Sequence, residues 1–142
     1  MYAIMIYIDS NVFIFAALNN EELGNNAKLI LEEVENRNME ASTSSLTFDE
    51  VVWIVKKNRN FEDAVSIGEA FLNMPGLHLV AVNQDLLALS ISIMKRYKTD
   101  PRDSIHAATA ITQKANIIIS EDTDFNKIKE LKRKGIMEFK MP

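Results

Sequence analysis

The stretch AIMIYI, residues 3–8, is an unbroken apolar run that ends at three polar residues, Asp9, Ser10 and Asn11. Apolar side chains at successive positions, rather than at alternate ones, are typical of a strand that is buried on both faces of a parallel sheet. A second run, IIIS at residues 117–120, has the same character and is again followed by acidic residues. Two such strands predict a sheet that is covered by helices on both faces.

The rest of the chain alternates helical patterns with short apolar runs. A short helix is expected to open at Ser10 or Asn11. Further helices are expected over residues 21–37, 48–57, 61–72, 84–98, 102–114 and 124–134. Thr47 is expected to cap the helix over residues 48–57. Strands are expected at residues 3–8, 39–42, 77–82, 117–120 and 137–140. This alternation predicts one α/β domain over residues 1–142: a three-layer α/β/α sandwich with a mainly parallel sheet of about five strands.

Composition excludes several kinds of site. The chain has no cysteine, four glycines and two histidines, which excludes a thiolate metal site, a cysteine nucleophile and a multi-histidine site. The glycines are too scattered for a dinucleotide-binding or P-loop motif. Carboxylates are plentiful, with 20 Asp and Glu against 16 Lys and Arg. No basic start or apolar run of about 20 residues is present, so we expect a cytoplasmic protein with no membrane segment.

Acidic residues follow strands or open helices in four separate segments. Asp9 follows the first strand, Asp122 and Asp124 follow the IIIS strand, and Glu50 and Asp103 lie in the first turns of expected helices. The carboxyl ends of parallel strands meet at one edge of a sheet, where ligands bind. Carboxylates gathered there repel one another unless a hard cation such as Mg²⁺ compensates their charge. The pattern therefore predicts a metal-dependent hydrolase of a phosphate ester.

Each of these acids also has a purely structural interpretation. Asp9 and Asp122 could cap helices, and Glu50 and Asp103 could favour the positive end of a helix dipole. His106 lies among alanines and is expected to be a packed structural histidine rather than a general base. The chain could also be another metal-dependent nuclease or phosphatase, or a non-catalytic RNA- or protein-binding domain.

Four blocks of the sequence together resemble one known family. They are YIDSNVFIFA at residues 7–16, SSLTFDEVVW at 44–53, DPRDSIHAATA at 100–110 and IISEDTDFNKI at 118–128. In this order, and across nearly the whole chain, they resemble the PIN-domain family and, within it, the small VapC-like toxin ribonucleases of prokaryotic toxin–antitoxin pairs.

The resemblance implies an endoribonuclease that depends on Mg²⁺ or Mn²⁺ and hydrolyses RNA phosphodiester bonds, with the 3′-hydroxyl as the leaving group. It implies that four catalytic and metal-binding acids act with an accessory acid; these are Asp9, Glu50, Asp103 and Asp122, with Asp124 as the accessory. It also implies a type II antitoxin as a protein partner, RNA as the substrate, and a homodimer.

Some points stay open at the level of sequence. Asp49 stands beside Glu50 and could be the second acid instead, and Glu121 stands where the family often has a small residue. A PIN domain outside toxin pairs, acting on other RNA or on DNA, and a non-catalytic PIN domain remain alternatives. Large apolar residues on the expected helices suggest a dimer contact or core packing rather than base stacking; they include Phe48, Trp53, Phe61, Phe71 and Met74.

Overall fold

Five parallel strands form the centre of the structure. The computed structural model describes residues 4–141. Its strands β1 (Ile6–Ile8), β2 (Ala41–Ser44), β3 (Leu77–Val80), β4 (Ile117–Ile119) and β5 (Lys132–Lys134) lie in the order β3-β2-β1-β4-β5. Every neighbouring pair runs parallel. The predicted parallel sheet is confirmed, while Ala3, the expected start of the first strand, lies outside the described residues together with the two ends of the expected domain.

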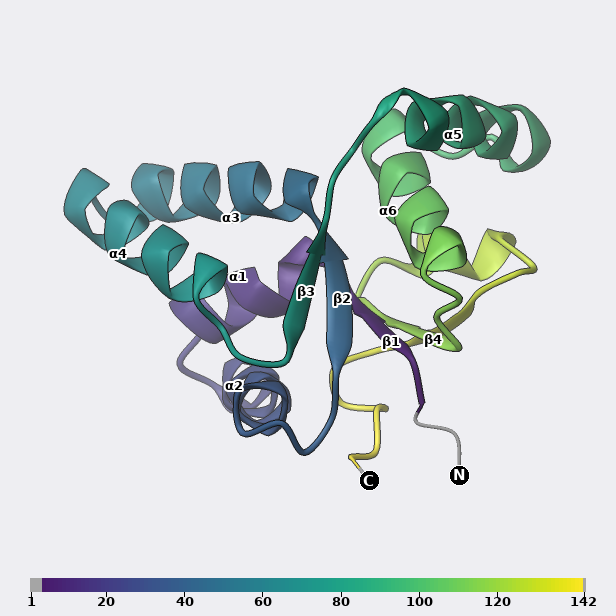
Figure 1. Ribbon diagram of the computed structural model, residues 1–142. Coiled ribbons are helices and arrows are strands. Elements are labelled where there is room, and N and C mark those ends of the chain that lie inside the picture. The colour runs from purple at the N-terminus through teal and green to yellow at the C-terminus, as the bar shows by residue number, and fades with distance from the viewer. Residues whose placement is uncertain (1–3, 142) are drawn as a thin grey trace.

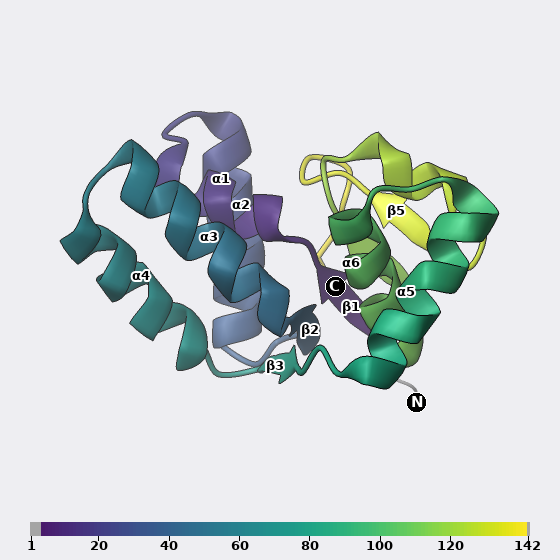
Figure 2. The same ribbon diagram turned by 90° about the horizontal axis from the view of Figure 1, so that it is seen from above.

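Helices cover both faces of this sheet (Figures 1 and 2). Four of them lie on one side: α1 (Ser10–Leu18), α2 (Glu22–Glu35), α3 (Ser45–Asn58) and α4 (Phe61–Leu72). On the other side lie α5 (Gln84–Tyr97), α6 (Pro101–Thr112) and a short 3₁₀ helix, η1 (Thr123–Lys127). The three-layer sandwich is therefore confirmed. No helix within residues 4–141 is long and apolar enough to cross a membrane.

The central strand β1 contributes side chains to both layers of the core. Ile6 and Ile8 pack into the cluster formed with α1 to α4, whereas Tyr7 points the other way, into the cluster formed with α5 and α6. All three side chains are at most 2% exposed. β1 lies between β2 and β4. The helices that connect β1 to β2 and those that connect β3 to β4 lie on opposite faces of the sheet. Sheets of this kind bind ligands in the crevice at this point.

The start of α3 differs from the sequence-based expectation. Thr47 is not the cap: Ser44, the last residue of β2, is the N-cap, and its Oγ accepts a hydrogen bond from the Leu46 N–H at 3.0 Å. Thr47 is fully buried one turn into the helix, where its hydroxyl lies 2.7 Å from that of Thr43. The strand thus passes directly into the helix, which places Glu50 in the second turn rather than the first.

The C-terminal segment also differs from expectation. The helix expected over residues 124–134 is the short η1 followed by the edge strand β5, and residues 137–140 form no strand. Phe125, Ile128 and Leu131 are buried against α6 and β4, at spacings that fit a helix as well as a turn. Pairing of β5 with β4 decides between a helix and an extended segment here. Lys132 and Lys134 then lie on an edge strand of the sheet, where positive charge opposes edge-to-edge association.

Candidate active site

Asp9, at the carboxyl end of β1, is held rigidly by hydrogen bonds. Its Oδ1 accepts from the Ser10 N–H at 2.8 Å, and its Oδ2 accepts from the Asn11 side-chain amide at 3.1 Å and from the Ser120 hydroxyl at 2.6 Å. Asp9 is only 4% exposed. Burial raises the pKa of Asp9, although His106 and these donors oppose the rise. Asp9 is therefore both the N-cap of α1 and a fixed acid at the expected edge.

Ser120, at the carboxyl end of β4, connects Asp9 to the acids that follow β4. Its hydroxyl donates to Asp9 and accepts from the Asp122 N–H at 3.0 Å. The Asp122 carboxylate in turn accepts from the Asp124 N–H at 2.9 Å and caps η1. The register of β1 with β4, in which Ile8 faces Ile119, places these two strand ends side by side.

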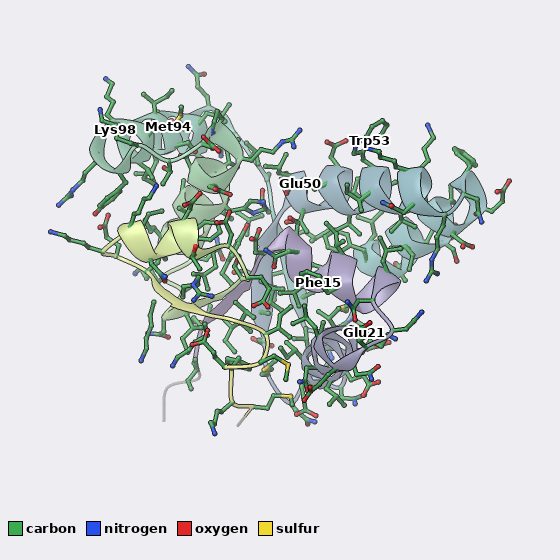
Figure 3. The ribbon with its side chains drawn as sticks, turned by 180° about the vertical axis from the view of Figure 1, so that it is seen from behind. Phe15, Glu21, Glu50, Trp53, Met94 and Lys98 are labelled. Carbon is green, nitrogen blue, oxygen red and sulfur yellow. The ribbon has the colours of Figure 1, made fainter. Side chains whose placement is uncertain are left out.

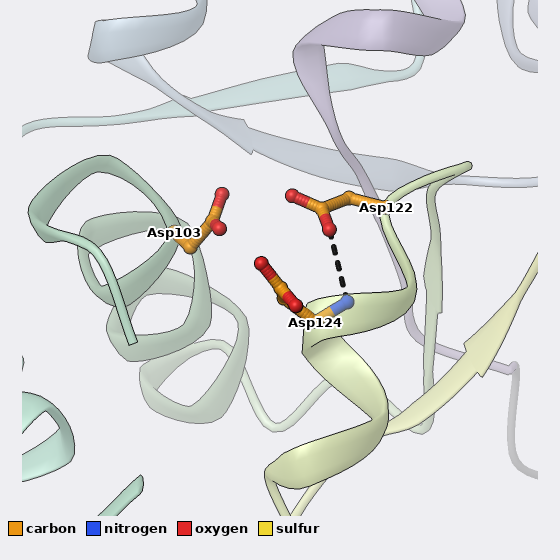
Figure 4. A group of neighbouring side chains, drawn as sticks. All are labelled: Asp103, Asp122 and Asp124. Carbon is orange, nitrogen blue, oxygen red and sulfur yellow. Dashed lines mark hydrogen bonds between the residues drawn. The ribbon is translucent and has the colours of Figure 1, made fainter. Parts of the chain in front are cut away.

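Asp103, from the first turn of α6, completes a cluster with Asp122 and Asp124. One carboxylate oxygen from each residue lies within 4.8 Å of the others. Figure 4 shows the three side chains next to one another. Burial, together with the negative charge of Asp122, the hydrogen bond to Asp122 and the charge of Asp9, raises the pKa of Asp103 to about 7. The strain of like charges at short range is what a bound cation would relieve.

His106, on α6, contacts both Glu50 and Asp9 and so places Glu50 next to this site. Its Nε2 lies 2.6 Å from Glu50 Oε1 and 3.5 Å from Asp9 Oδ1, and its Nδ1 lies 2.6 Å from the Tyr7 hydroxyl. The ring is 1% exposed. Burial alone would lower the pKa of His106, but the hydrogen bond to Glu50 and the charges of the surrounding acids outweigh it, so that the pKa is raised. A positively charged His106 offsets the charge of the two acids it contacts.

Glu50, and not Asp49, faces the site. Glu50 lines a surface hollow of about 480 Å³ whose other lining residues come from the start of α6 and the end of β4; they are Asp100, Pro101, Arg102, Asp103 and Asp122. Asp49 is exposed and does not line this hollow. Glu121 also points elsewhere, because its carboxylate accepts from the Ile136 N–H at 3.0 Å.

The structure thus brings all five expected acids to one end of the sheet, in two groups. Asp103, Asp122 and Asp124 form the close cluster, while Asp9 and Glu50 lie beside it and share His106. Sequence reasoning assigned His106 to packing and did not find its contacts with these acids. It also gave no role to Ser120, Tyr7 or Arg102. A serine between a buried strand and two acids, and a tyrosine in an otherwise aliphatic strand, were the available signals.

The ligands in the close cluster are all carboxylate oxygens, which are the donors that Mg²⁺ and Mn²⁺ prefer. The histidine beside the cluster is already occupied on both ring nitrogens by Tyr7 and Glu50. The residues present therefore fit a hard divalent cation and not a zinc-type site.

Comparison with known proteins agrees with this geometry. The sequence profile of the PIN domain matches residues 6–131. The chain belongs to the PIN domain family. The match spans the strands and helices that carry all five acids, and the β3-β2-β1-β4-β5 sheet with its acidic edge is this PIN domain's architecture.

Individual PIN proteins show the same similarity. Ribonuclease VapC2 of Methanocaldococcus jannaschii is 24% identical over 135 residues, covering 87% of this chain and 88% of that protein. Among solved structures, VapBC2 from Rickettsia felis, bound to a DNA fragment from its promoter, matches with a TM-score of 0.73 and 17% identity, covering 93% of this chain and 98% of that one. VapC20 of Mycobacterium tuberculosis, a toxin that cleaves the sarcin–ricin loop, matches with a TM-score of 0.73 and 14% identity, covering 87% and 95%.

Proposed function

We propose that this PIN domain is a cytoplasmic endoribonuclease that depends on Mg²⁺ or Mn²⁺ and serves as the toxin of a type II toxin–antitoxin pair. The observation that carries the proposal is the cluster of Asp103, Asp122 and Asp124, with three carboxylate oxygens within 4.8 Å of one another. Membership of the PIN family and the similarity to a ribonuclease support it.

Asp103, Asp122 and Asp124 would hold the cation, and Asp9 and Glu50 would add negative charge beside it. The cation, when bound, lowers the pKa of a water and stabilises the negative charge that develops on the phosphate. Asp9, fixed by three donors, holds its carboxylate in one orientation. Water adds to phosphorus, the bond to the 3′-oxygen breaks, and that oxygen leaves with a proton as the 3′-hydroxyl.

Arg102 is placed to hold the substrate's phosphate. It is the only cationic residue lining the hollow, and no residue within 4–141 forms a hydrogen bond or an ion pair with its guanidinium. A guanidinium binds phosphate oxygens in a bidentate manner. An exposed Arg102 among acids therefore gives RNA a point of attachment in a chain whose formal net charge is −4.

The test is cleavage of a single-stranded RNA in Mg²⁺ or Mn²⁺, with EDTA as the metal-free control. Glu50→Gln should reduce the rate by about a hundredfold, because it removes a negative charge beside the proposed cation site and weakens the contact with His106. Asp49→Asn is the matched control and should change the rate less than threefold. Cleavage that continues in EDTA would exclude the proposed function. A large loss of cleavage rate in Asp49→Asn with a small loss in Glu50→Gln would exchange the roles of these two residues.

Two separate exposed apolar stripes support the protein partners. Phe61, Val65 and Leu72 lie on one side of α4 and are 62%, 42% and 56% exposed, while Leu87 and Ile91 on α5 are 43% and 51% exposed. Stripes of this kind mark protein contacts. We assign these two stripes jointly to the contacts with a second copy of the chain and with an antitoxin. Of the expected contact residues, Phe71 is excluded, because it is buried against Phe13 with 4% exposure.

A further inference from the structure

Trp53 stands on the outer surface of α3 rather than in the core. Its side chain is 57% exposed, and Figure 3 shows it on α3 beside Glu50, further along the same helix. Residues three and four positions away are the neighbours of a side chain on a helix surface. For Trp53 these neighbours are all charged: Asp49, Glu50, Lys56 and Lys57. Of the two roles expected for Trp53, packing in the core is therefore wrong, whereas a subunit contact stays a prediction.

The ring of Trp53 is also separate from the apolar surface of the same helix. Phe48 and Val52 face α4, where they line a hollow of about 190 Å³ with residues that include Gly68 and Leu72. Trp53 does not line that hollow. An indole in a protein interface is expected to lie within a continuous apolar patch. An exposed aromatic ring with lysines beside it is instead the arrangement found where proteins bind single-stranded nucleic acid.

Position on α3 connects Trp53 to the acid site. Glu50 lines the hollow that contains Asp103 and Asp122, and a rise of about 1.5 Å per residue places Trp53 about 4.5 Å further along the helix axis. One nucleotide spans such a distance. The Lys56 ammonium lies 6.0 Å from the centre of the Trp53 ring, so positive charge is available next to the ring for a phosphate.

We propose that Trp53 is a base-stacking platform for RNA at this site. An unpaired base stacks on the indole, Lys56 and Lys57 neutralise adjacent phosphates, and the neighbouring phosphodiester lies over the acid hollow. Bases of a duplex are already stacked and paired, so only an unpaired base can stack on the ring. The inference rests on the proposed ribonuclease function and adds to it a residue that binds a base of the substrate.

The chain offers a direct readout, because Trp53 is its only tryptophan. Titration of the full-length protein with a short single-stranded RNA of mixed sequence, in Ca²⁺ to limit turnover, should quench the tryptophan emission. The same RNA made with abasic nucleotides should bind through its phosphates and quench far less. Annealing the RNA to its complement should also reduce the quenching, because its bases are then paired.

Substitution tests the energetic contribution of the ring. Trp53→Leu keeps an apolar side chain without a stacking surface and should weaken RNA binding by about tenfold or more, the size expected for one stacked base. Trp53→Phe should recover most of this loss. Leu29→Ala is the control, because Leu29 is 45% exposed, lies on α2 and does not line the acid hollow; it should bind RNA as the wild type does.

The outcomes separate this inference from the function beneath it. If the wild type cleaves RNA while its emission stays unchanged and Trp53→Leu binds normally, the stacking platform is excluded and the ribonuclease stands. If the wild type neither binds nor cleaves RNA, both proposals fail. If Trp53→Leu loses self-association in light scattering and keeps its RNA affinity, Trp53 is a protein contact and the inference is overturned.

Discussion

The acid site has two halves that differ in how their charge is balanced. In the buried half, Asp9 and Glu50 contact His106, and Asp9 accepts three further hydrogen bonds. In the open half, Asp103, Asp122 and Asp124 are only half-buried. Within that half, the Asp122 carboxylate accepts a hydrogen bond from the Asp124 N–H, and the Lys127 ammonium lies 3.6 Å from Asp124 Oδ1, with both side chains about half exposed. Among the described residues, Asp103 and Asp122 have no ion-pair partner.

This difference shows which half is complete. In the buried half, His106 offsets part of the charge of Asp9 and Glu50, so the protein itself supplies a partner for these acids. In the open half, burial and the negative charge of Asp122 raise the pKa of Asp103 to about 7, and an added proton or cation would relieve the repulsion. We therefore expect the buried half to hold its side chains in position and the open half to bind the cation. Four predictions test this division.

The largest expected effect is on catalysis. Asp103→Asn removes one ligand charge from the open half and no side-chain volume, so RNA cleavage in Mn²⁺ should fall by about a thousandfold while the fold persists. Cleavage rates and circular dichroism of the two proteins measure this. A variant that cleaves at the wild-type rate would show that Asp103 is merely the acid of a helix first turn.

The second effect is on the stability of the buried half. His106→Ala leaves Glu50 and Asp9 without their cationic partner and opens a cavity, and should lower the free energy of unfolding by about 2–4 kcal/mol. Tyr7→Phe, which removes the hydrogen bond to the same ring and the one that the Tyr7 hydroxyl accepts from the Ser44 N–H, should cost about 1–2 kcal/mol. Urea unfolding of both variants in EDTA checks the order. Equal losses would mean that the histidine does not balance these acids.

The third effect is the response to metal. A cation that binds only the folded protein adds about 2.7 kcal/mol of stability at a hundredfold excess over its Kd, which should raise the melting temperature by several degrees. Asp103→Asn should gain much less from Mn²⁺, and in EDTA it should melt at or above the wild type. Identical shifts in the two proteins would place the cation outside the open half.

The smallest effect is a slope with pH in the absence of metal. The pKa of Asp103 is about 7 in the folded protein against an ordinary 3.8, so between these pH values the folded state binds more protons than the unfolded chain. Stability therefore falls as pH rises through this window. Asp103→Asn should show a flatter profile in thermal melts from pH 4.5 to about 7.5. A slope that is unchanged by the substitution would assign it to other groups.

The sequence alone predicted much of this protein, because the relevant signals are local. Two aliphatic runs without alternation, at residues 3–8 and 117–120, predicted buried parallel strands, and acids at the ends of strands predicted one acidic edge. Asp9 and Asp122 were expected at that edge because they follow strands, and Asp103 because it lies in the first turn of a helix. The lysine-rich end was predicted wrongly, since apolar spacing over residues 124–134 fits a helix and only pairing with β4 makes part of it a strand.

Tertiary structure decided which acids contact His106 and which form the close cluster. Residues 9, 50 and 106 are far apart in sequence, and they meet because β1 lies between β2 and β4 while α3 and α6 begin at the same end of the sheet. No local pattern distinguishes a histidine packed among alanines from one that holds two carboxylates. Whether a charge is balanced depends on what lies within a few ångströms through space, and that distance is set by the order of the strands rather than by the order of the residues.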